Sequence, residues 1–376
     1  MNKRIVIVRS NAIEPDSRVE KEANSLVKNG NTVTLVAWDR SDNYLVKKDF
    51  KKLVAGKVRR ISFGAKASFG VGMKSLLPYL KFQISLFLWL LKNKNNYDIC
   101  HFCDFDTAFT GSNACMLTKK PFIFDIFDYL STDANTGFQR LIEKLENNII
   151  NHSSATIICT EQRKMQIRKA SPKKVEIIHN TPDIFMDNTN DDICHDDEKI
   201  KIAYVGIFQE YRLLEELLSV VSKSDNIELH IGGFGKLENI VNEYSIKYSN
   251  IFYYGKLQYR EALNLEKKCD IMTAIYDPQI GNHLYAAPNK FYEALLLGKP
   301  LIMVKNTGMS ENIKKHDIGV LIDYSEKGLK EGIETLIKNR DKWIDMSRKM
   351  KKLYTDEFSW NEMERRLIKL YDSIDL

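Results

Sequence analysis

The sequence predicts an α/β protein built from two doubly wound, parallel-sheet domains. With 376 residues, 44% of them hydrophobic, the chain is long enough to form two separate cores. Short β-branched runs alternate with helical segments, and strands separated by helices of this length form parallel β-α-β units. The alternation stops at a polar, acidic stretch and then starts again. We therefore expect a first domain over residues 1–182, a linker over 183–198, a second domain over 199–358 and a final helix over 359–376.

The first domain is expected to open with a buried strand over residues 4–9. A polar loop and a helix over about 18–29 follow, and Gly30 ends this helix. Later β-branched runs continue the series, with helices between several of them. The further strands expected in this domain cover residues 32–37, 57–63, 99–103, 121–125 and 155–159.

The second domain repeats this alternation. Ligands of open α/β sheets bind at the carboxyl ends of the strands, so we expect the ligand site there. The expected strands cover residues 201–205, 227–231, 251–254, 271–274, 301–304 and 319–322. The expected helices cover residues 212–222, 237–248, 260–267, 290–297, 327–339, 341–354 and 360–371.

Charge is distributed unevenly along the chain. The formal net charge is +6, but residues 1–180 hold 29 basic and 17 acidic residues, a net charge of +12. This half, with clustered basic residues at 51, 52, 57, 59 and 60, predicts contact with an anionic membrane or a phosphorylated partner. Lysines on an ordinary solvated surface are the alternative. Nucleic-acid binding is not expected, because no basic motif interleaved with aromatic residues occurs.

The longest apolar stretch covers residues 76–91. Lys81 and Gln83 interrupt it, and it is too short to span a bilayer. A core helix packed on the sheet is the preferred interpretation, and a helix lying on a membrane face is the alternative.

The cysteines show neither a disulfide framework nor a paired zinc spacing, and the chain starts without signal-peptide architecture. We interpret the Cys100-x-x-Cys103 pair as buried thiols and expect a reduced, cytoplasmic protein. The six cysteines are Cys100, Cys103, Cys115, Cys159, Cys194 and Cys269.

The most specific segment covers residues 288–302. Pro288 precedes a short helix that Gly298 ends, and the helix N-terminus attracts phosphate. Glu293 can accept two hydrogen bonds from ribose hydroxyls, as carboxylates do in nucleotide sites. A surface salt bridge between Glu293 and Lys290 is the alternative.

Two further segments follow strands of the second domain. Gly206 is expected to end a strand and let the backbone approach a ligand, and Arg212 at the next helix suits a diphosphate. The glycine-rich residues 232–235 are only loosely similar to a dinucleotide fingerprint, and we expect a tight turn there.

The motif Pro288-x-Lys290-x-x-Glu293-Ala294, followed by Gly298-Lys299-Pro300, resembles the donor-site signature of glycosyltransferase family 4. The members of this family are retaining enzymes of the GT-B fold, in which two Rossmann-like domains face a central cleft and the last helix crosses back to the first domain. Other segments resemble the family in order and spacing. They are residues 16–30, 97–104 (His-x-His-Asp type), 124–128 (Asp-x-His-Glu type), 175–182 and 358–360.

The resemblance implies a role for each matching residue. Donor binding is assigned to Gly206, Arg212, Gly255, Lys256, Leu257, Tyr285, Pro288, Asn289, Lys290 and Glu293. The acceptor side of the cleft is assigned to Asn11, Arg18, His101, Cys103, Asp104 and Asp128. Catalysis is assigned to Arg212, Lys290, His101 and Asp104.

The resemblance also implies a reaction. A hexosyl or related sugar would pass, with retention, from a UDP- or GDP-sugar to a hydroxyl of a glycan or polyprenyl-diphosphate-linked acceptor. Bacterial cell-surface polysaccharide synthesis at the inner face of the cytoplasmic membrane fits this chemistry. No metal or other cofactor is expected. An Asp-x-Asp pair that clamps a metal on the donor diphosphate should lie in the donor half, but Asp104-Phe105-Asp106 lies in the acceptor half.

The sequence departs from the family at several positions. Tyr285 stands where the family often has a glutamate, and Cys103 and Phe127 stand where it has histidines. One basic residue, Arg212, follows Gly206 where two are frequent. Two alternatives therefore remain, a non-catalytic nucleotide-sugar-binding subunit and a nucleotide-sugar epimerase of the same fold.

Overall fold

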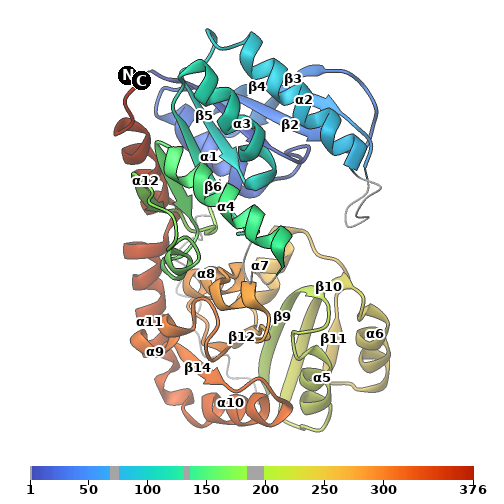
Figure 1. The fold of residues 1–376 in the computed structure, drawn as a ribbon. Coiled ribbons are helices and arrows are strands. Elements are labelled where there is room, and N and C mark those ends of the chain that lie inside the picture. Colours follow the sequence, from blue (N-terminus) through green and yellow to red (C-terminus); the bar gives the residue numbers. More distant parts are fainter. Residues whose placement is uncertain (1, 68–75, 131–135, 184–198) are drawn as a thin grey trace. The chain divides into compact units, whose positions relative to one another are not determined.

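The computed structural model describes residues 2–67, 76–130, 136–183 and 199–376. The chain forms two compact units (Figure 1). Unit 1 comprises Met1–Asn180 together with Met363–Leu376, and unit 2 comprises Thr181–Glu362. Cys194 and residues 184–198 of the expected linker lie outside the described residues.

Unit 1 contains an eight-stranded sheet of order β3-β4-β2-β1-β5-β6-β7-β8. All neighbouring strands are parallel except β3, which pairs antiparallel with β4 at the sheet edge. Its strands are β1 (Arg4–Arg9), β2 (Thr32–Asp39), β3 (Lys47–Leu53), β4 (Gly56–Gly64), β5 (Ile99–Cys103), β6 (Phe122–Ile126), β7 (Ala155–Ile158) and β8 (Val175–Ile177).

Helices cover both faces of the first sheet. Residues on alternate positions of a strand point to opposite faces. Val6 and Val8 of β1 therefore share a core with α2, α3 and α4, and α1 and α12 lie on the other face. The helices of this unit are α1 (Ser17–Lys28), α2 (Leu76–Lys92), α3 (Phe105–Thr118), α4 (Gly137–His152), the short η2 (Glu161–Met165) and most of α12 (Trp360–Asp372).

The first helix, α1, shows how local sequence sets these elements. The Asp16 side chain accepts a hydrogen bond from the Val19 N–H (3.2 Å) and so caps the first turn. Gly30 follows the helix with φ +82°, a backbone conformation that favours glycine. These two signals explain why α1 begins at Ser17 and ends at Lys28.

Unit 2 contains a six-stranded parallel sheet of order β11-β10-β9-β12-β13-β14. One face packs against α5, α6 and α10, and the other against α7, α8 and α9, while α11 contributes residues to both cores. The strands are β9 (Ile200–Phe208), β10 (Ile227–Gly235), β11 (Ile251–Tyr253), β12 (Ile271–Ala274), β13 (Leu301–Val304) and β14 (Gly319–Ile322). The helices are α5 (Leu214–Ser222), α6 (Glu238–Lys247), α7 (Tyr259–Lys267), α8 (Asn289–Leu297), α9 (Ser310–His316), α10 (Glu326–Lys338) and α11 (Trp343–Leu353), joined by the short η3 (Gly281–Tyr285), η4 (Arg340–Lys342) and η5 (Tyr354–Phe358).

The two central strands of unit 2 run further than the sequence predicts. Gly206 lies inside β9, which pairs with β10 as far as Phe208 and Gly235. The expectation that Gly206 ends its strand, and that residues 232–235 form a tight turn, was therefore wrong. A Cβ on Gly233 would lie 1.9 Å from the Gly206 carbonyl oxygen, and Gly233 has φ +153°. Glycine is required at position 233 because the two backbones approach closely there.

Neither a disulfide nor a bilayer-spanning helix occurs in the described chain. Its five described cysteines are all buried and unpaired. Among the helices formed by the described residues, none is both long enough and apolar enough to cross a membrane.

Candidate functional site

The carboxyl edge of the second sheet carries a partly buried arginine that lies against a tyrosine ring. Arg212 lies in the loop between β9 and α5, and its guanidinium carbon sits 3.7 Å from the centre of the Tyr276 ring, just beyond β12. Its Nη1 is buried, and no hydrogen-bond partner for it occurs among the described residues. A buried guanidinium nitrogen without an acceptor is costly, so this site favours binding of an anion.

Two buried carboxylates hold a lysine on the adjacent helices. Lys290 Nζ, on α8, lies 2.7 Å from Glu293 Oε2 on the same helix and 2.7 Å from Glu266 Oε1 on α7. Both carboxylates are 1% exposed. Burial raises the pKa of Glu266 to about 8; Lys290 opposes this shift and Glu293 adds to it. The ion pair considered from sequence is therefore present, but in the interior rather than on the surface.

The pKa of the Tyr276 hydroxyl is affected by the arginine and by this charged cluster. Burial raises the pKa of Tyr276, while the charges of Arg212 and Lys290 oppose the rise and that of Glu293 supports it. The Arg212 guanidinium lies against the Tyr276 ring, and Lys290 and Glu293 lie on α8 of the same unit. That these three groups bind one donor stays a prediction.

A short histidine-containing segment completes this edge. The His283 ring meets the Tyr276 ring edge-on, with centroids 5.2 Å apart, and its Nδ1 lies 2.9 Å from the Asp277 carbonyl oxygen. Burial lowers the pKa of His283, and nearby Arg212 contributes. Gly308 N–H donates to the His283 carbonyl (3.1 Å), which ties η3 to the loop after β13. Burial and the Arg212 charge thus both favour the neutral form of His283, whose ring packs edge-on against Tyr276.

The remaining donor candidates lie on the same unit. Gly255 follows β11 and accepts a hydrogen bond from Gly233 N–H (2.8 Å) through its carbonyl oxygen. Leu257 packs against Gly232, where a Cβ would lie 2.5 Å from the leucine Cδ1. The others are the exposed Lys256 and Asn289, the half-buried Tyr285 and the buried Pro288, the N-cap of α8.

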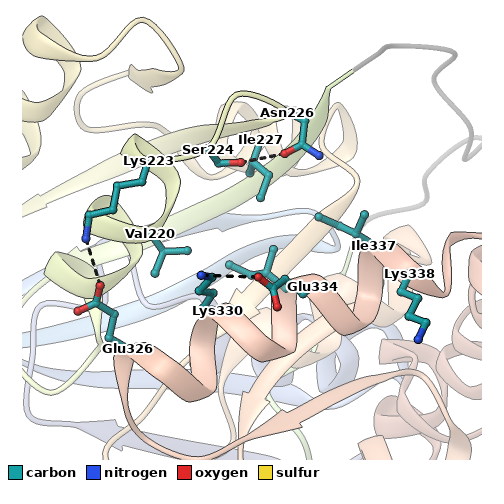
Figure 2. A pocket seen from close by; sticks show the side chains of 11 residues that line it. Val220, Lys223, Ser224, Asn226, Ile227, Glu326, Lys330, Glu334, Ile337 and Lys338 are labelled. Atoms are coloured by element: carbon teal, nitrogen blue, oxygen red, sulfur yellow. Dashed lines mark hydrogen bonds and ion pairs between the residues drawn. The ribbon is translucent and has the colours of Figure 1, made fainter.

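Cavities occur at both edges of the second sheet. A cavity of about 200 Å³ is lined by Arg212, Tyr324 and the first turn of α5. A larger one, of about 520 Å³, lies between α5 and α10 beside Ile227, the first residue of β10 (Figure 2). Figure 2 shows the pairs Lys223–Glu326 and Lys330–Glu334 on its rim. Because Ile227 starts its strand and Arg212 follows the end of another, the larger cavity lies at the edge away from the donor candidates.

Unit 1 holds a fully buried polar network rather than an open site. Arg18 Nη2 donates to Asp125 Oδ1 (2.7 Å), and its Nε donates to Glu22 Oε1 (3.1 Å). His101 places Nε2 3.3 Å from Asp125 Oδ2 and Nδ1 2.8 Å from the Tyr371 hydroxyl of α12. Burial raises the pKa of Glu22 to about 7, whereas Arg18 and His101 hold the pKa of Asp125 below its usual range despite burial.

Three residues assigned to the acceptor side lie in or beside this network. His101 and Cys103 are 0% exposed and Arg18 is 5% exposed, so none of them lines a surface. They point to the face of the sheet covered by α1 and α12, where only a fully paired charge is tolerated. One ligand atom each of His101, Cys103 and Asp125 falls within 4.8 Å of the others, a spacing that could hold a metal ion. Arg18 already pairs with Asp125, which disfavours a cation there.

Other acceptor-side candidates lie at the carboxyl edge of the first sheet. Asp104 accepts hydrogen bonds from the Phe127 and Asp128 N–H groups (2.8 and 3.1 Å) and pairs with Arg9. Burial raises the pKa of Asp104 to about 6, although Arg9 opposes the shift. Asp128 is exposed and pairs with Arg163 (3.2 Å).

Asn11, the last of these candidates, is half-buried and donates to Asp16 Oδ2 (2.8 Å). It therefore lies in the loop after β1, beside the N-cap of α1.

Phe127, which replaces a family histidine, lies between two cations. The guanidinium carbons of Arg9 and Arg18 sit 4.4 and 4.3 Å from the centre of its ring. Cation–π attraction stabilises this arrangement, whereas a protonated histidine would be repelled by both arginines. The substitution at 127 is thus compatible with the neighbouring charges.

Two family models match successive parts of the chain. The model for Glycosyltransferase Family 4 matches residues 17–184, and the model for glycosyl transferases group 1 matches residues 186–353. The chain belongs to glycosyltransferase family 4. No curated protein sequence matches it significantly.

Solved structures of similar fold cover nearly the whole glycosyltransferase. Sucrose-phosphate synthase from Thermosynechococcus elongatus has a TM-score of 0.73 at 13% identity, covering 99% of this chain and 98% of that one. Anabaena HepE in complex with UDP and glucose has a TM-score of 0.69 at 12% identity, covering 99% and 100%. The E. coli trehalose-6-phosphate protein bound with UDP-2-fluoro glucose has a TM-score of 0.71 at 10% identity, covering 99% of each. At these identities the match shows the fold, which is the GT-B type with two Rossmann-like domains.

Sequence reasoning on this family 4 glycosyltransferase missed several polar groups. Glu266 and His283 reach the donor candidates from α7 and η3, and neither belongs to a recognised motif. Tyr276 could have been found, because it follows strand β12 directly and the carboxyl ends of parallel strands meet at one edge. Tyr371 carried no signal, since only the packing of α12 brings it to His101.

Proposed function

We propose that this glycosyltransferase binds a uridine-diphosphate sugar at the carboxyl edge of the second sheet and transfers the sugar with retention of configuration. The observation that supports this most directly is the buried Nη1 of Arg212, for which the described residues offer no hydrogen-bond partner. The buried carboxylate of Glu293 lies on α8 of the same unit. A nucleoside diphosphate offers the two matching groups, a phosphate anion and ribose hydroxyl donors.

The contacts of Lys290 suggest a division of labour among the charged residues. Lys290 Nζ lies 2.7 Å from an oxygen of Glu293 and 2.7 Å from an oxygen of Glu266, so its N–H donors are already engaged within the unit. We therefore assign the diphosphate to Arg212 and the start of α8, and we assign Lys290 to holding Glu293 in position for the ribose. This revises the expectation that Lys290 cradles the diphosphate.

Catalysis would follow from the charge that develops on the leaving group. As the bond between the sugar and the diphosphate breaks, negative charge grows on the diphosphate, and the Arg212 guanidinium stabilises it. The departing diphosphate would take the proton of the acceptor hydroxyl on the same face, which preserves the anomeric configuration. We propose that no metal takes part, and that activity persists in excess chelator.

The acceptor and the pathway complete the proposal. Asp104, Asp128 and Asn11 lie at the carboxyl edge of the first sheet, where a sugar hydroxyl could be oriented. We propose a glycan or polyprenyl-diphosphate-linked acceptor in cell-surface polysaccharide synthesis, at the cytoplasmic face of the membrane. The donor base is proposed as uracil because the HepE structures contain UDP or UDP-glucose and the E. coli protein contains UDP-2-fluoro glucose.

Calorimetric titration with UDP, GDP and ADP tests the donor site. We expect UDP to bind most tightly and Arg212→Ala and Glu293→Ala each to weaken binding at least tenfold, about 1.4 kcal/mol or more. Arg348→Ala is the matched control, because Arg348 is an exposed arginine of α11 in the same unit. Unchanged UDP affinity in both site variants, with the fold intact, would remove the donor assignment.

Product analysis tests the reaction itself. With UDP-sugar and acceptor, the NMR spectrum of the product should show the anomeric configuration of the donor. Isomerised donor in the absence of any acceptor would instead indicate an epimerase, and nucleotide binding without turnover would indicate a non-catalytic subunit.

A further inference from the structure

Helix α2 is apolar on both of its faces. Phe82, Leu86 and Leu90 are buried in the core of unit 1, as the preferred sequence interpretation required. The opposite face, however, is exposed and also apolar. The exposed fractions are 77% for Leu77, 45% for Leu80, 61% for Ile84 and 58% for Leu88. A surface helix in contact with water usually carries polar residues on its outer face. The exposed face of α2 is instead suited to contact with apolar material.

The neighbouring helix α3 also carries exposed apolar side chains. The two helices lie side by side (Figure 1), and Gln83 Nε2 donates to the Asp106 carbonyl oxygen across their contact (2.6 Å). On α3, Met116 and Leu117 are exposed, the latter by 69%. We call Leu77, Leu80, Ile84, Leu88, Met116 and Leu117 together the α2–α3 surface.

The charges around the α2–α3 surface have one sign. Residues 76–120, all of which the structure describes, contain four exposed lysines: Lys81, Lys92, Lys94 and Lys119. The carboxylates in this range are Asp98, Asp104 and Asp106, and each is partly buried. Exposed lysines beside exposed leucines complement a bilayer, in which anionic headgroups lie above apolar acyl chains.

We propose that the α2–α3 surface docks onto the headgroup region of an anionic lipid bilayer. Leucine and isoleucine side chains enter the acyl boundary, and the flanking lysines remain at the level of the anionic headgroups. Because α2 has only 17 residues, it lies on the bilayer rather than crossing it. The acyl chains of such a bilayer match the apolar outer face, and its phosphates match the lysines beside that face. This docking goes beyond the proposed reaction and does not depend on it.

Vesicle flotation of the full chain tests the docking. We expect the protein to float with vesicles of phosphatidylcholine containing about 30% phosphatidylglycerol, and to bind at least tenfold more weakly to pure phosphatidylcholine. Binding should fall when salt is raised from 0.1 to 0.5 M, because screening weakens the lysine contribution. Failure to float with the anionic vesicles would overturn the proposal.

Substitutions then locate the surface. The triple variant Leu80→Gln/Ile84→Gln/Leu88→Gln changes only exposed side chains, and we expect it to lose at least tenfold in vesicle binding. Ile246→Gln/Ile344→Gln is the matched control, because these exposed isoleucines of unit 2 lie outside the surface. Equal vesicle binding by the triple variant and wild type would overturn the assignment to these helices.

Two further measurements separate competing explanations. If the protein forms a dimer in lipid-free ultracentrifugation, and the triple variant is monomeric, then a second copy covers the surface and the lipid proposal is overturned. UDP titration of the triple variant should match wild type, since the donor candidates lie on unit 2. If the wild-type protein does not bind UDP, the proposed function is refuted and the docking is not. If it binds UDP but not anionic vesicles, the docking is refuted and the donor site is not.

Discussion

Replacing Glu266 by glutamine should flatten the dependence of stability on pH in unit 2. Glu266 is 1% exposed, and burial raises its pKa from 4.5 to about 8. Between these pH values the folded unit keeps a proton that the unfolded chain has lost. The free energy of unfolding therefore falls as the pH rises from about 4.5 to 8, and Glu266→Gln removes this fall.

The expected size of the effect follows from the shift. At 1.36 kcal/mol per pKa unit, a rise from 4.5 to about 8 corresponds to an upper limit of roughly 5 kcal/mol. Water that enters the site when Glu266 ionises reduces this value, and we expect about 3–5 kcal/mol. In a unit of this size each kcal/mol changes the melting temperature by about 2–4 °C. The wild type should therefore lose roughly 6 °C or more relative to the variant between pH 5 and pH 8.

The assay is scanning calorimetry of both proteins at several pH values from 5 to 9. Hydrogen exchange of the α7 and α8 amides assigns the transition to unit 2. Other titrating groups contribute equally to both proteins, so the difference between the two curves isolates Glu266. Glu243→Gln, which changes an exposed carboxylate of α6, should keep the wild-type slope. Parallel curves for wild type and Glu266→Gln would refute the reasoning.

Three further predictions concern packing and the buried network. Gly233→Ala should cost at least 2 kcal/mol in unfolding experiments, because its Cβ would lie 1.9 Å from a carbonyl oxygen; Gly56→Ala, at φ +140° in open space, should cost only about 1 kcal/mol. Tyr371→Phe should cost about 1–3 kcal/mol of stability by denaturant titration, because the His101 ring loses a buried hydrogen bond of 2.8 Å; no loss would contradict this role. Arg18→Met should destabilise unit 1 by about 3–5 kcal/mol at pH 8, and less at pH 5 where a carboxylate partner is protonated; an equal loss at both values would speak against unpaired buried charge as the cause.

The strands were largely predictable because their apolar runs are short and bounded. The expected strand at residues 4–9 matches β1, and those at 271–274 and 301–304 match β12 and β13. Strand β3 was missed because it is an edge strand rich in lysine, with only one buried residue. Helix α9 was missed because it has seven residues, too few for a clear period.

Residues of the candidate site could be predicted only where they belong to a sequence motif with a known spacing. The 288–293 motif indicated the Lys290–Glu293 pair, which the structure contains, and the joint role of this motif and Arg212 stays a prediction. Glu266 escaped prediction because its partnership with Lys290 depends on how α7 packs against α8. The burial of His101 and Cys103 was not predictable either, because it requires α12 to cover that face.

The division of unit 1 into two stretches of chain affects how the protein is made. Residues 1–180 leave the ribosome before residues 363–376, which complete their fold. At 5–20 residues per second, the intervening 182 residues take roughly 10–40 s to synthesise. During that interval His101 lacks the hydroxyl of Tyr371, and the Lys3 side chain lacks the Ile374 carbonyl to which it donates (3.0 Å). Unit 2, which is continuous in sequence, can therefore fold before unit 1 is complete, and until then the part of the first sheet that α12 covers stays exposed.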